Sequence, residues 1–321
     1  MEIFKLIPAG KDYLWGGTKL KTAYGKNIPI SPLAETWECS VHPDGLSIIA
    51  NGSNKGKSLK EVLQEHPEYL GTKFAHNCDL PILVKLIDAE QNLSVQVHPD
   101  DEYSMKHEGQ NGKTEMWYIV DAADDASIVH GFEHTVTKEI LQAAVKEGTL
   151  YNQLHRVAVE KGECYYIPAG TVHAIGAGCV IAEVQQSSNV TYRVYDYDRI
   201  DKNGKKRELH FDKAVEVMQM QPSQNVRRKP KLVKYFPLCS VQELCSCKYF
   251  SVEKIDAQKN YEFTVFDESF QVILCLDGSG TANIDNESDT IYFTKGECLF
   301  IYAGAGECKI EGAFRLLKVR C

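Results

Sequence analysis

Residues 161–173 read Lys-Gly-Glu-Cys-Tyr-Tyr-Ile-Pro-Ala-Gly-Thr-Val-His, and this stretch decides the predicted fold. The bulky run at 165–167 predicts a short strand. Pro168 and Gly170 end that strand, because proline donates no backbone hydrogen bond and glycine permits positive φ. His173 follows at once, and a rigid turn that holds one histidine at the end of a strand suits a metal ligand. A solvent-exposed histidine after an ordinary turn is the alternative that these residues alone leave open.

Composition restricts the classes of protein to which the chain can belong. It has 321 residues, is 43% hydrophobic and carries a formal net charge of −8. A large core can therefore form, and the acidic balance argues against broad nucleic-acid binding, which needs a basic face. The first residues lack a signal-peptide pattern, and no apolar run approaches the length of a membrane span. We expect a cytoplasmic protein that does not contact membranes.

The chain contains eleven cysteines, an odd number that is scattered along the sequence. In a cytoplasmic protein we expect these thiols to be reduced. Cys245 and Cys247 are too close for a usual zinc pair and have no second pair nearby, so we interpret them as structural.

Three segments before the opening stretch predict strands with polar faces. Residues 81–89 form a branched apolar run that Lys85 interrupts, and a charge in such a run needs a partner or a ligand. Residues 93–98 alternate with period two, so the polar side chains at 94, 96 and 98 share one face. Residues 113–120 predict another strand, with the side chains at 113 and 115 on the same face.

Other segments predict the remaining organisation. A capping box begins a helix at residues 58–65, and helical spacing recurs at 137–147 and 212–220. We interpret the basic segment 227–231 as a solvated linker and expect two domains, 1–228 and 229–321. The second should consist of strands with tight turns, such as one at 277–280.

The opening stretch recurs near the C-terminus. Residues 295–304 read Lys-Gly-Glu-Cys-Leu-Phe-Ile-Tyr-Ala-Gly and match 161–170 at most positions. Tyr302 replaces the proline, and Glu307 falls where His173 would stand. A duplicated β unit with only one chemically equipped copy explains this pattern, with chance similarity of two turns as the alternative.

Four side chains of the first unit form a candidate metal site. They are Gln96, His98, Glu115 and His173. The interior of a β-barrel would bring such residues together. Two imidazoles with oxygen ligands suit Zn²⁺, and also Fe²⁺, Mn²⁺ or Co²⁺. A polar cluster in the mouth of the barrel, without metal, is the alternative.

Ordered motifs give the chain a resemblance to a known family. The spacing Gly-x5-Pro-x-Gly-x2-His at 162–173 resembles the second motif of the cupin superfamily. More closely, the chain resembles the zinc-dependent type I mannose-6-phosphate isomerases, above all their compact bacterial members. The motifs are Leu-Ser-Val-Gln-Val-His-Pro-Asp-Asp at 93–101, Lys-Thr-Glu at 113–115, Pro-Ala-Gly-Thr-Val-His at 168–173 and Thr-Tyr-Arg-Val-Tyr-Asp-Tyr-Asp-Arg at 191–199.

This resemblance implies a mainly β fold: a cupin-type double-stranded β-helix (jelly-roll) barrel with helical insertions, and a second, degenerate cupin-like β unit. It also implies one zinc ion and the interconversion of mannose 6-phosphate and fructose 6-phosphate. Matched by motif, the metal ligands are Gln96, His98, Glu115 and His173, the catalytic residue is Arg193, and the substrate-binding residues are Lys85, Ser94 and Lys113. One position departs from the family, because many members have aspartate where this chain has Asn189.

The chemistry of the reaction suits these residues independently. Aldose–ketose isomerisation moves a proton between C1 and C2 through an enediol, and a metal and a cation can stabilise the developing oxyanion. Lys85 and Lys113 can balance the phosphate of the phosphosugar. The general base remains open among metal-bound water, a ligand carboxylate and a pocket histidine, and the oligomeric state is not predicted. The alternative functions are an iron-dependent cupin oxygenase, which would favour another histidine at position 96, and a non-catalytic sugar-binding cupin.

Overall fold

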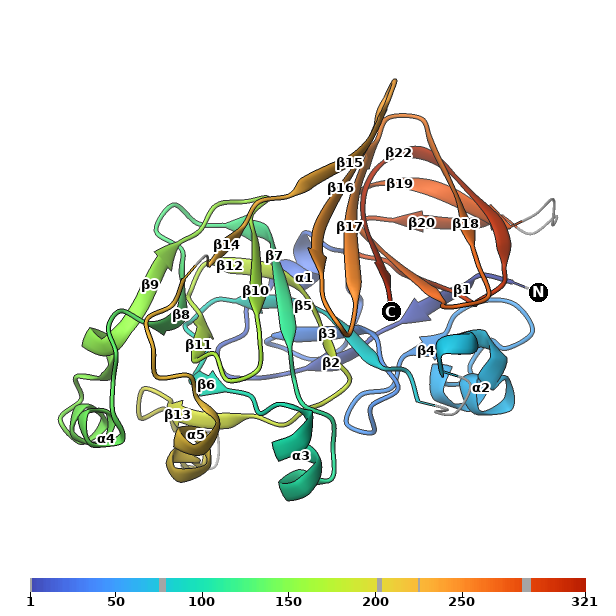
Figure 1. Cartoon of the computed structure of the whole chain (residues 1–321). Helices are drawn as coiled ribbons and strands as arrows, with labels where there is room; N and C mark the ends of the chain where they lie inside the picture. The colour runs from blue at the N-terminus through green and yellow to red at the C-terminus, as the bar shows by residue number, and fades with distance from the viewer. Residues whose placement is uncertain (1, 75–78, 201–203, 225, 285–289) are drawn as a thin grey trace.

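A computed structural model describes residues 2–74, 79–200, 204–224, 226–284 and 290–321. The described chain is mainly β and forms two β-rich parts that lie side by side (Figure 1). The first part holds two antiparallel sheets and the second part holds one. The expected fold class is confirmed.

The sheet through the middle of the first part has seven strands in the order β14-β10-β7-β12-β5-β3-β2. They span Arg227–Arg228, Cys164–Ile167, Glu115–Ala122, Cys179–Gln186, Ile82–Ala89, Glu35–Cys39 and Ala9–Lys11. Every residue of the central strands β5 and β12 is buried. Strand β5 confirms the strand predicted over residues 81–89.

The second sheet of this part has five strands in the order β13-β6-β11-β8-β9. They span Tyr192–Tyr195, Val95–Val97, His173–Ile175, Ser127–Phe132 and Leu154–Ala158. One cavity is lined by residues of β5, β7 and β12 and by residues of β6, β11 and β13. The two sheets therefore enclose the site between them.

The third sheet contains ten strands, with the path β15-β16-β17-β22-β19-β21-β1-β4. These span Lys231–Phe236, Cys239–Ser246, Ser251–Ala257, Gly306–Arg320, Gln271–Ile284, Cys298–Ile301, Phe4–Ile7 and Ile48–Ile49. Two more strands complete it, β18 (Asn260–Val265) beside β22 and β20 (Ile291–Thr294) beside β19. Two short strands from the start of the chain thus join the C-terminal sheet, and the division of the chain after residue 228 stays a prediction.

The internal repeat has the same backbone in both copies. Strand β10 and strand β21 are each preceded by a glycine with positive φ, Gly162 at 95° and Gly296 at 87°. Each is followed by another, Gly170 at 86° and Gly304 at 76°. Because these angles favour glycine, the shared letters encode the same two turns. The second β unit is thereby related to the first.

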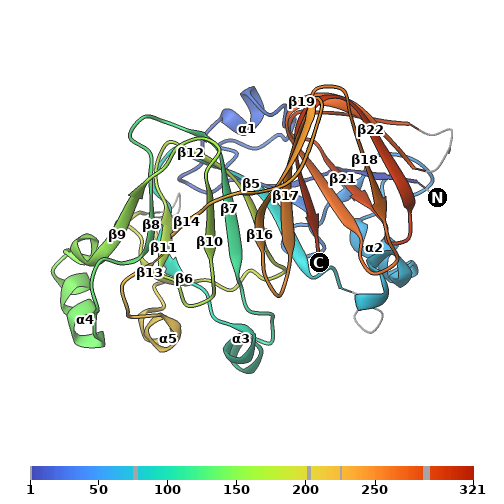
Figure 2. The same ribbon diagram turned by 45° about the horizontal axis from the view of Figure 1, so that its top comes forward.

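Helices lie around the edges of the sheets. The five α-helices of the described residues are α1 (Lys19–Thr22), α2 (Leu59–Glu65), α3 (Asp101–Glu108), α4 (Lys138–Lys146) and α5 (Phe211–Val217). Single 3₁₀ turns span Pro67–Leu70, Thr72–Phe74 and Leu150–Gln153. Figures 1 and 2 both place α3, α4 and α5 along one edge of the first part, with α2 below the second. The predicted capping box of α2 is present, whereas α3 is a helix that the sequence patterns did not predict.

Two local predictions were wrong. Residues 277–280 continue strand β19, because Gly278 adopts φ +79° at an irregularity in the strand and Gly280 lies where a Cβ atom would be 2.5 Å from the Glu311 carbonyl oxygen. Close strand approach, and not a turn, explains these glycines. Arg227 and Arg228 form β14 beside β10, so this end of the expected linker is part of a sheet.

Among the described residues, no helix combines the length and the apolar character that crossing a membrane requires.

Candidate metal centre and pocket

Strand register brings three predicted site residues into one row. Gln96 of β6 lies opposite His173 of β11 on one side and opposite Arg193 of β13 on the other. Directly opposed residues of antiparallel strands project from the same face of a sheet. The row therefore places a histidine, an amide and a guanidinium side by side.

Three of the predicted metal ligands form a compact cluster. One ligand atom from each of His98, Glu115 and His173 lies within 4.8 Å of the others. The Nε2 atom of His98 is 3.3 Å from Glu115 Oε1, and the Nε2 atom of His173 is 3.7 Å from Glu115 Oε2. Each of the three side chains is only 1% exposed. A buried cluster of this kind needs a charge or donors to balance it.

Backbone carbonyl groups orient both imidazoles. Nδ1 of His98 donates to the Val190 carbonyl oxygen and Nδ1 of His173 to the Thr171 carbonyl oxygen, both at 2.8 Å. The lone pair of each Nε2 atom is then directed toward the carboxylate. Burial lowers the pKa of His98 to about 4, with the charge of Lys113 acting in the same direction. Burial and the neighbouring His98 lower the pKa of His173 to about 3, so both rings are neutral at pH 7.

The carboxylate between the rings has few partners of its own. Both oxygens of Glu115 are buried, and among the described residues Oε2 has no hydrogen-bond partner, while Oε1 faces an ammonium group. Burial alone would raise the pKa of Glu115, but the nearby Lys113 and His98 hold it well below its ordinary value. The Lys113 Nζ atom lies 2.7 Å from Glu115 Oε1 and 3.1 Å from His98 Nε2.

This donor set fits a divalent cation. Two neutral imidazoles and an ionised carboxylate with an unsatisfied oxygen are the ligands that such ions take from proteins. The Gln96 amide lies beside them, with Nε2 3.4 Å from His173 Nε2. Rotation of the amide by 180° exchanges its nitrogen and oxygen, so Gln96 can also present an oxygen to the cluster.

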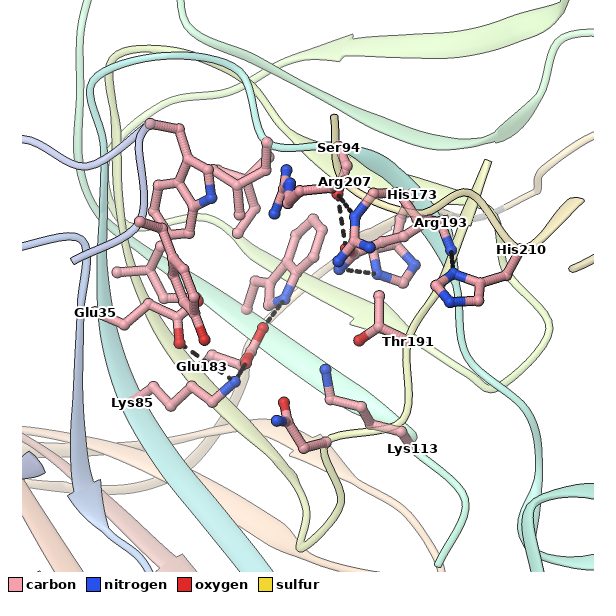
Figure 3. Close-up of a pocket in the computed structure, with 18 residues that line it drawn as sticks. Glu35, Lys85, Ser94, Lys113, His173, Glu183, Thr191, Arg193, Arg207 and His210 are labelled. Carbon is pink, nitrogen blue, oxygen red and sulfur yellow. Dashed lines mark hydrogen bonds and ion pairs between the residues drawn. The ribbon is translucent and has the colours of Figure 1, made fainter. Parts of the chain in front are cut away.

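A cavity of about 250 Å³ opens beside the cluster. Gln96, Lys113 and His173 line it, while His98 and Glu115 are not part of its lining. Figure 3 shows the lining side chains projecting inward from both sheets. The other lining residues are Tyr13, Trp15, Glu35, Lys85, Ile87, Leu93, Ser94, Trp117, Ile175, Glu183, Asn189, Thr191, Arg193, Arg207 and His210.

Lys85 belongs to a buried ionic network. It lies opposite Glu183 in the pairing of β5 and β12, and its Nζ atom is 3.1 Å from Glu183 Oε1 and 3.7 Å from Glu35 Oε2. Tryptophan side chains hold both carboxylates, because Trp117 Nε1 donates to Glu183 and Trp37 Nε1 donates to Glu35, both at 2.8 Å. Burial would lower the pKa of Lys85, but Glu35 and Glu183 raise it above its ordinary value.

Arg193 lies beside Gln96, one of the predicted ligands. Its Nε atom donates to Ser94 Oγ at 3.3 Å, and its Nη1 atom donates to the Glu208 carbonyl oxygen at 3.1 Å. Ser94 Oγ in turn donates to Gln96 Oε1 at 3.2 Å. The departure at Asn189 is also explained locally, because its amide donates to Asp44 Oδ2 at 2.8 Å and the residue lines the cavity.

All eight predicted site residues lie in the cavity lining or in the cluster. Glu183 is not among them, although this carboxylate interrupts an apolar strand just as Lys85 does. Arg207 and His210 also line the cavity without having been predicted, because no motif contains them.

Comparison with known proteins gives a consistent result along the chain. The family "Phosphomannose isomerase type I, catalytic domain" matches residues 3–139, and "Mannose-6-phosphate isomerase, cupin domain" matches residues 240–321. The mannose-6-phosphate isomerase ManA of Bacillus subtilis is 40% identical over 307 residues, which cover 95% of this chain and 94% of that protein. The mannose-6-phosphate isomerase of Streptococcus mutans is 43% identical over 205 residues, 64% of both chains. The crystal structure of the B. subtilis mannose 6-phosphate isomerase superposes with a TM-score of 0.92 at 36% identity and covers 99% of both chains.

Proposed function

The chain belongs to the type I phosphomannose isomerase family, and from that membership we propose that it interconverts mannose 6-phosphate and fructose 6-phosphate. The observation that carries the proposal is the buried cluster of His98, Glu115 and His173 beside a cavity that also contains Arg193. Such a site combines ligands for a cation with a fixed positive charge, and both serve a reaction in which an oxyanion develops.

We propose that Gln96, His98, Glu115 and His173 hold one zinc ion. The neutral imidazoles and the orphan Oε2 atom of Glu115 support a divalent ion, and the tetrahedral preference of zinc suits two histidines and two oxygen donors. A divalent ion bound there would act as a Lewis acid on the sugar oxygens at C1 and C2.

The side chains around the cluster have distinct proposed roles. Arg193 balances the negative charge that develops on the oxygens of C1 and C2, because it is fixed by Ser94 beside Gln96. Lys85, Ser94 and Lys113 contact the substrate from the cavity wall. Among the described lining residues, Glu35, Glu183 and His210 are further groups that can take up a proton between C1 and C2.

The alternative functions receive no support from the comparisons. The relatives named above are isomerases, and none of them is an oxygenase or a sugar-binding regulator. The chain also retains Arg193 and Lys113 in the cavity, where a non-catalytic binder would not need them.

We further propose a cytoplasmic location, which agrees with reduced thiols. All ten cysteines within the described residues are free.

A coupled assay of fructose 6-phosphate formation, together with metal analysis, tests the proposal. We expect about one zinc ion per chain and turnover of mannose 6-phosphate. His173→Ala should lose metal and activity together, whereas His155→Ala, on strand β9 outside the cavity lining, should keep both. Full activity in a metal-free His173→Ala protein would show that the site is assigned wrongly.

A further inference from the structure

The charges near the metal ligands leave little positive charge for a phosphate group. The buried charge group, as we call Lys85, Lys113, Glu35, Glu115 and Glu183, contains two ammonium groups and three carboxylates. Each ammonium group lies within 4 Å of at least one of these carboxylates. With all five groups ionised, a divalent ion at the ligands would make the whole group only singly positive. A sugar phosphate is nearly doubly negative at pH 7, so its charge needs another partner.

The exposed side of the same cavity has the opposite balance. Arg193, Arg199 and Arg207 gather around a single buried carboxylate, Asp196. Arg207 donates to Asp196 from Nε at 2.7 Å and from Nη2 at 2.5 Å. Arg199 also donates a hydrogen bond to the same carboxylate. Arg199, Arg207 and Asp196 together carry one net positive charge, and Arg193, which we assign to the reacting carbons, adds a second one nearby. Glu208, a nearby acid in the chain, has a side chain that is 83% exposed and pairs with His210 at 3.9 Å.

Arg207 is the member of this set with a free hydrogen-bonding edge. Its side chain is 31% exposed and lines the cavity, whereas Arg199 is not part of the lining. Two of its nitrogens hold Asp196, and within the described residues the third, Nη1, has no hydrogen-bond partner. The carboxylate therefore fixes the guanidinium plane and leaves donors for a ligand. Figure 3 shows Arg207 on the same side of the pocket as Ser94 and Arg193, apart from Lys85 and Glu183.

We propose that Arg207, held by Asp196, binds the phosphate group of the substrate. The inference rests on the proposed function, because it uses the shape of a hexose 6-phosphate. In that molecule the phosphate is on C6, at the far end from C1 and C2. If C1 and C2 lie at the metal ligands, the phosphate lies toward the rim, where the positive charge is in excess. Arg207 then determines the preference for phosphorylated sugars, and Lys85 and Lys113 contact the uncharged part of the substrate.

Titration calorimetry with mannitol 6-phosphate tests this role without turnover, since the sugar alcohol has no carbonyl group to isomerise. The protein is the metal-loaded full chain. For Arg207→Gln we expect the dissociation constant to rise about 10- to 100-fold, as is typical when a charged hydrogen bond is lost. Arg207→Lys keeps the charge and should lose less. Arg156→Gln is the matched control, because it removes an exposed cation of strand β9 that neither lines the cavity nor contacts Asp196, and it should change the constant less than about threefold.

Two results would overturn the assignment. One is an Arg207→Gln protein that binds mannitol 6-phosphate within threefold of the wild type, and the other is an Arg156→Gln protein that is weakened as much as Arg207→Gln. If the Arg207→Gln protein does not fold, the Arg207→Lys protein is measured instead. It should bind mannitol 6-phosphate more weakly than the wild type, because lysine lacks the planar guanidinium that donates two parallel hydrogen bonds to a phosphate. Unchanged binding in Arg207→Lys would then overturn the assignment. The proposed function fails separately, when the wild-type protein binds mannitol 6-phosphate but does not convert mannose 6-phosphate.

Discussion

At the residue scale, the site depends on how each polar side chain is held by a neighbour. Ser94 connects Arg193 to Gln96, so the guanidinium is fixed next to the metal ligands before any substrate arrives. Burial lowers the pKa of Arg193, yet an arginine remains charged at every pH at which the protein is folded. A fixed cation of this kind needs no reorganisation when negative charge develops on the substrate.

Arg193→Ala should therefore act mainly on the transition state. The reacting end of the sugar is neutral in the ground state and becomes negative as the enediolate forms. We expect kcat to fall about 10²- to 10³-fold with a modest change in KM. Lys85→Ala should raise KM more, because Lys85 would meet the substrate in both states. Steady-state kinetics with metal content checked measures this, and a large rise in KM with kcat near wild type would make Arg193 a binding residue.

Asp196 predicts a pH dependence of stability. Burial alone would raise its pKa, but hydrogen bonds from Arg207 and Arg199 bring it below the ordinary value of about 3.9. The ionised form is thus favoured in the folded state, so its contribution to stability is present above about pH 4 and is lost as the pH falls through the folded-state pKa. We expect Asp196→Asn to lower the melting temperature at pH 6 and to differ less from wild type near pH 3. Asp198→Asn, whose side chain is 77% exposed, should change little at either pH. A wild-type advantage over Asp196→Asn that stays constant from pH 6 to pH 3 would contradict this account.

At the scale of the element, the repeated strand and turn show what one histidine requires. Strands β10 and β21 end in turns with the same glycine conformation, but only the first turn leads into a proposed metal ligand. In the first copy, the turn also supplies the Thr171 carbonyl oxygen that orients His173. The turn is therefore both the end of a strand and part of the site.

The two glycines provide a matched pair of substitutions. A Cβ atom at Gly170 would lie 2.9 Å from the Val217 carbonyl oxygen, whereas one at Gly304 would meet its nearest neighbours at 4.0 Å. Both positions have positive φ, so alanine should cost about 1–2 kcal/mol of stability at each, and more at Gly170 because of the close backbone oxygen. Only Gly170→Ala should also shift the turn and weaken zinc binding. Denaturant unfolding and competition with a zinc chelator measure the two effects, and equal zinc affinity in both variants would exclude the proposed coupling.

The site residues that could be predicted belong to continuous sequence motifs. These motifs are the strands with polar side chains at every second position and the Pro-Gly turn. Which of these residues come into contact depends on the register of strand pairing, and local sequence patterns do not predict that register. Glu183 and Lys85 lie opposite each other on β12 and β5, although they are almost a hundred residues apart in the chain. Arg207 comes from a segment after β13 without regular structure, so periodicity could not identify it. The wrong prediction of a turn at 277–280 also came from a missing tertiary contact. A glycine that permits close approach of two strands cannot be distinguished in the sequence from a glycine that a turn requires.

At the scale of the whole molecule, the largest part of the hydrophobic core lies away from the proposed metal ligands. One apolar cluster fills the C-terminal sheet and extends to β5, β7 and β12, and two smaller clusters pack elsewhere in the first part. The cluster that contains Trp117 adjoins the proposed ligands, because the ring centroids of Trp117 and His173 are 5.4 Å apart. Burial of these apolar clusters drives folding, and the proposed metal site is a buried polar region beside them.

Removal of the metal should therefore abolish activity without unfolding the protein. Chelation should leave the far-UV circular dichroism spectrum nearly unchanged at 25 °C, because the apolar clusters stay in place. It should nevertheless lower the melting temperature, since a ligand at 100 times its dissociation constant stabilises the folded state by about 2.7 kcal/mol. The buried Glu115 carboxylate, whose Oε2 atom has no hydrogen-bond partner among the described residues, adds to this loss when its cation is removed. His173→Ala is the control, because its melting temperature should respond neither to chelator nor to added zinc. Collapse of the β spectrum on chelation would show that the metal organises the barrel itself.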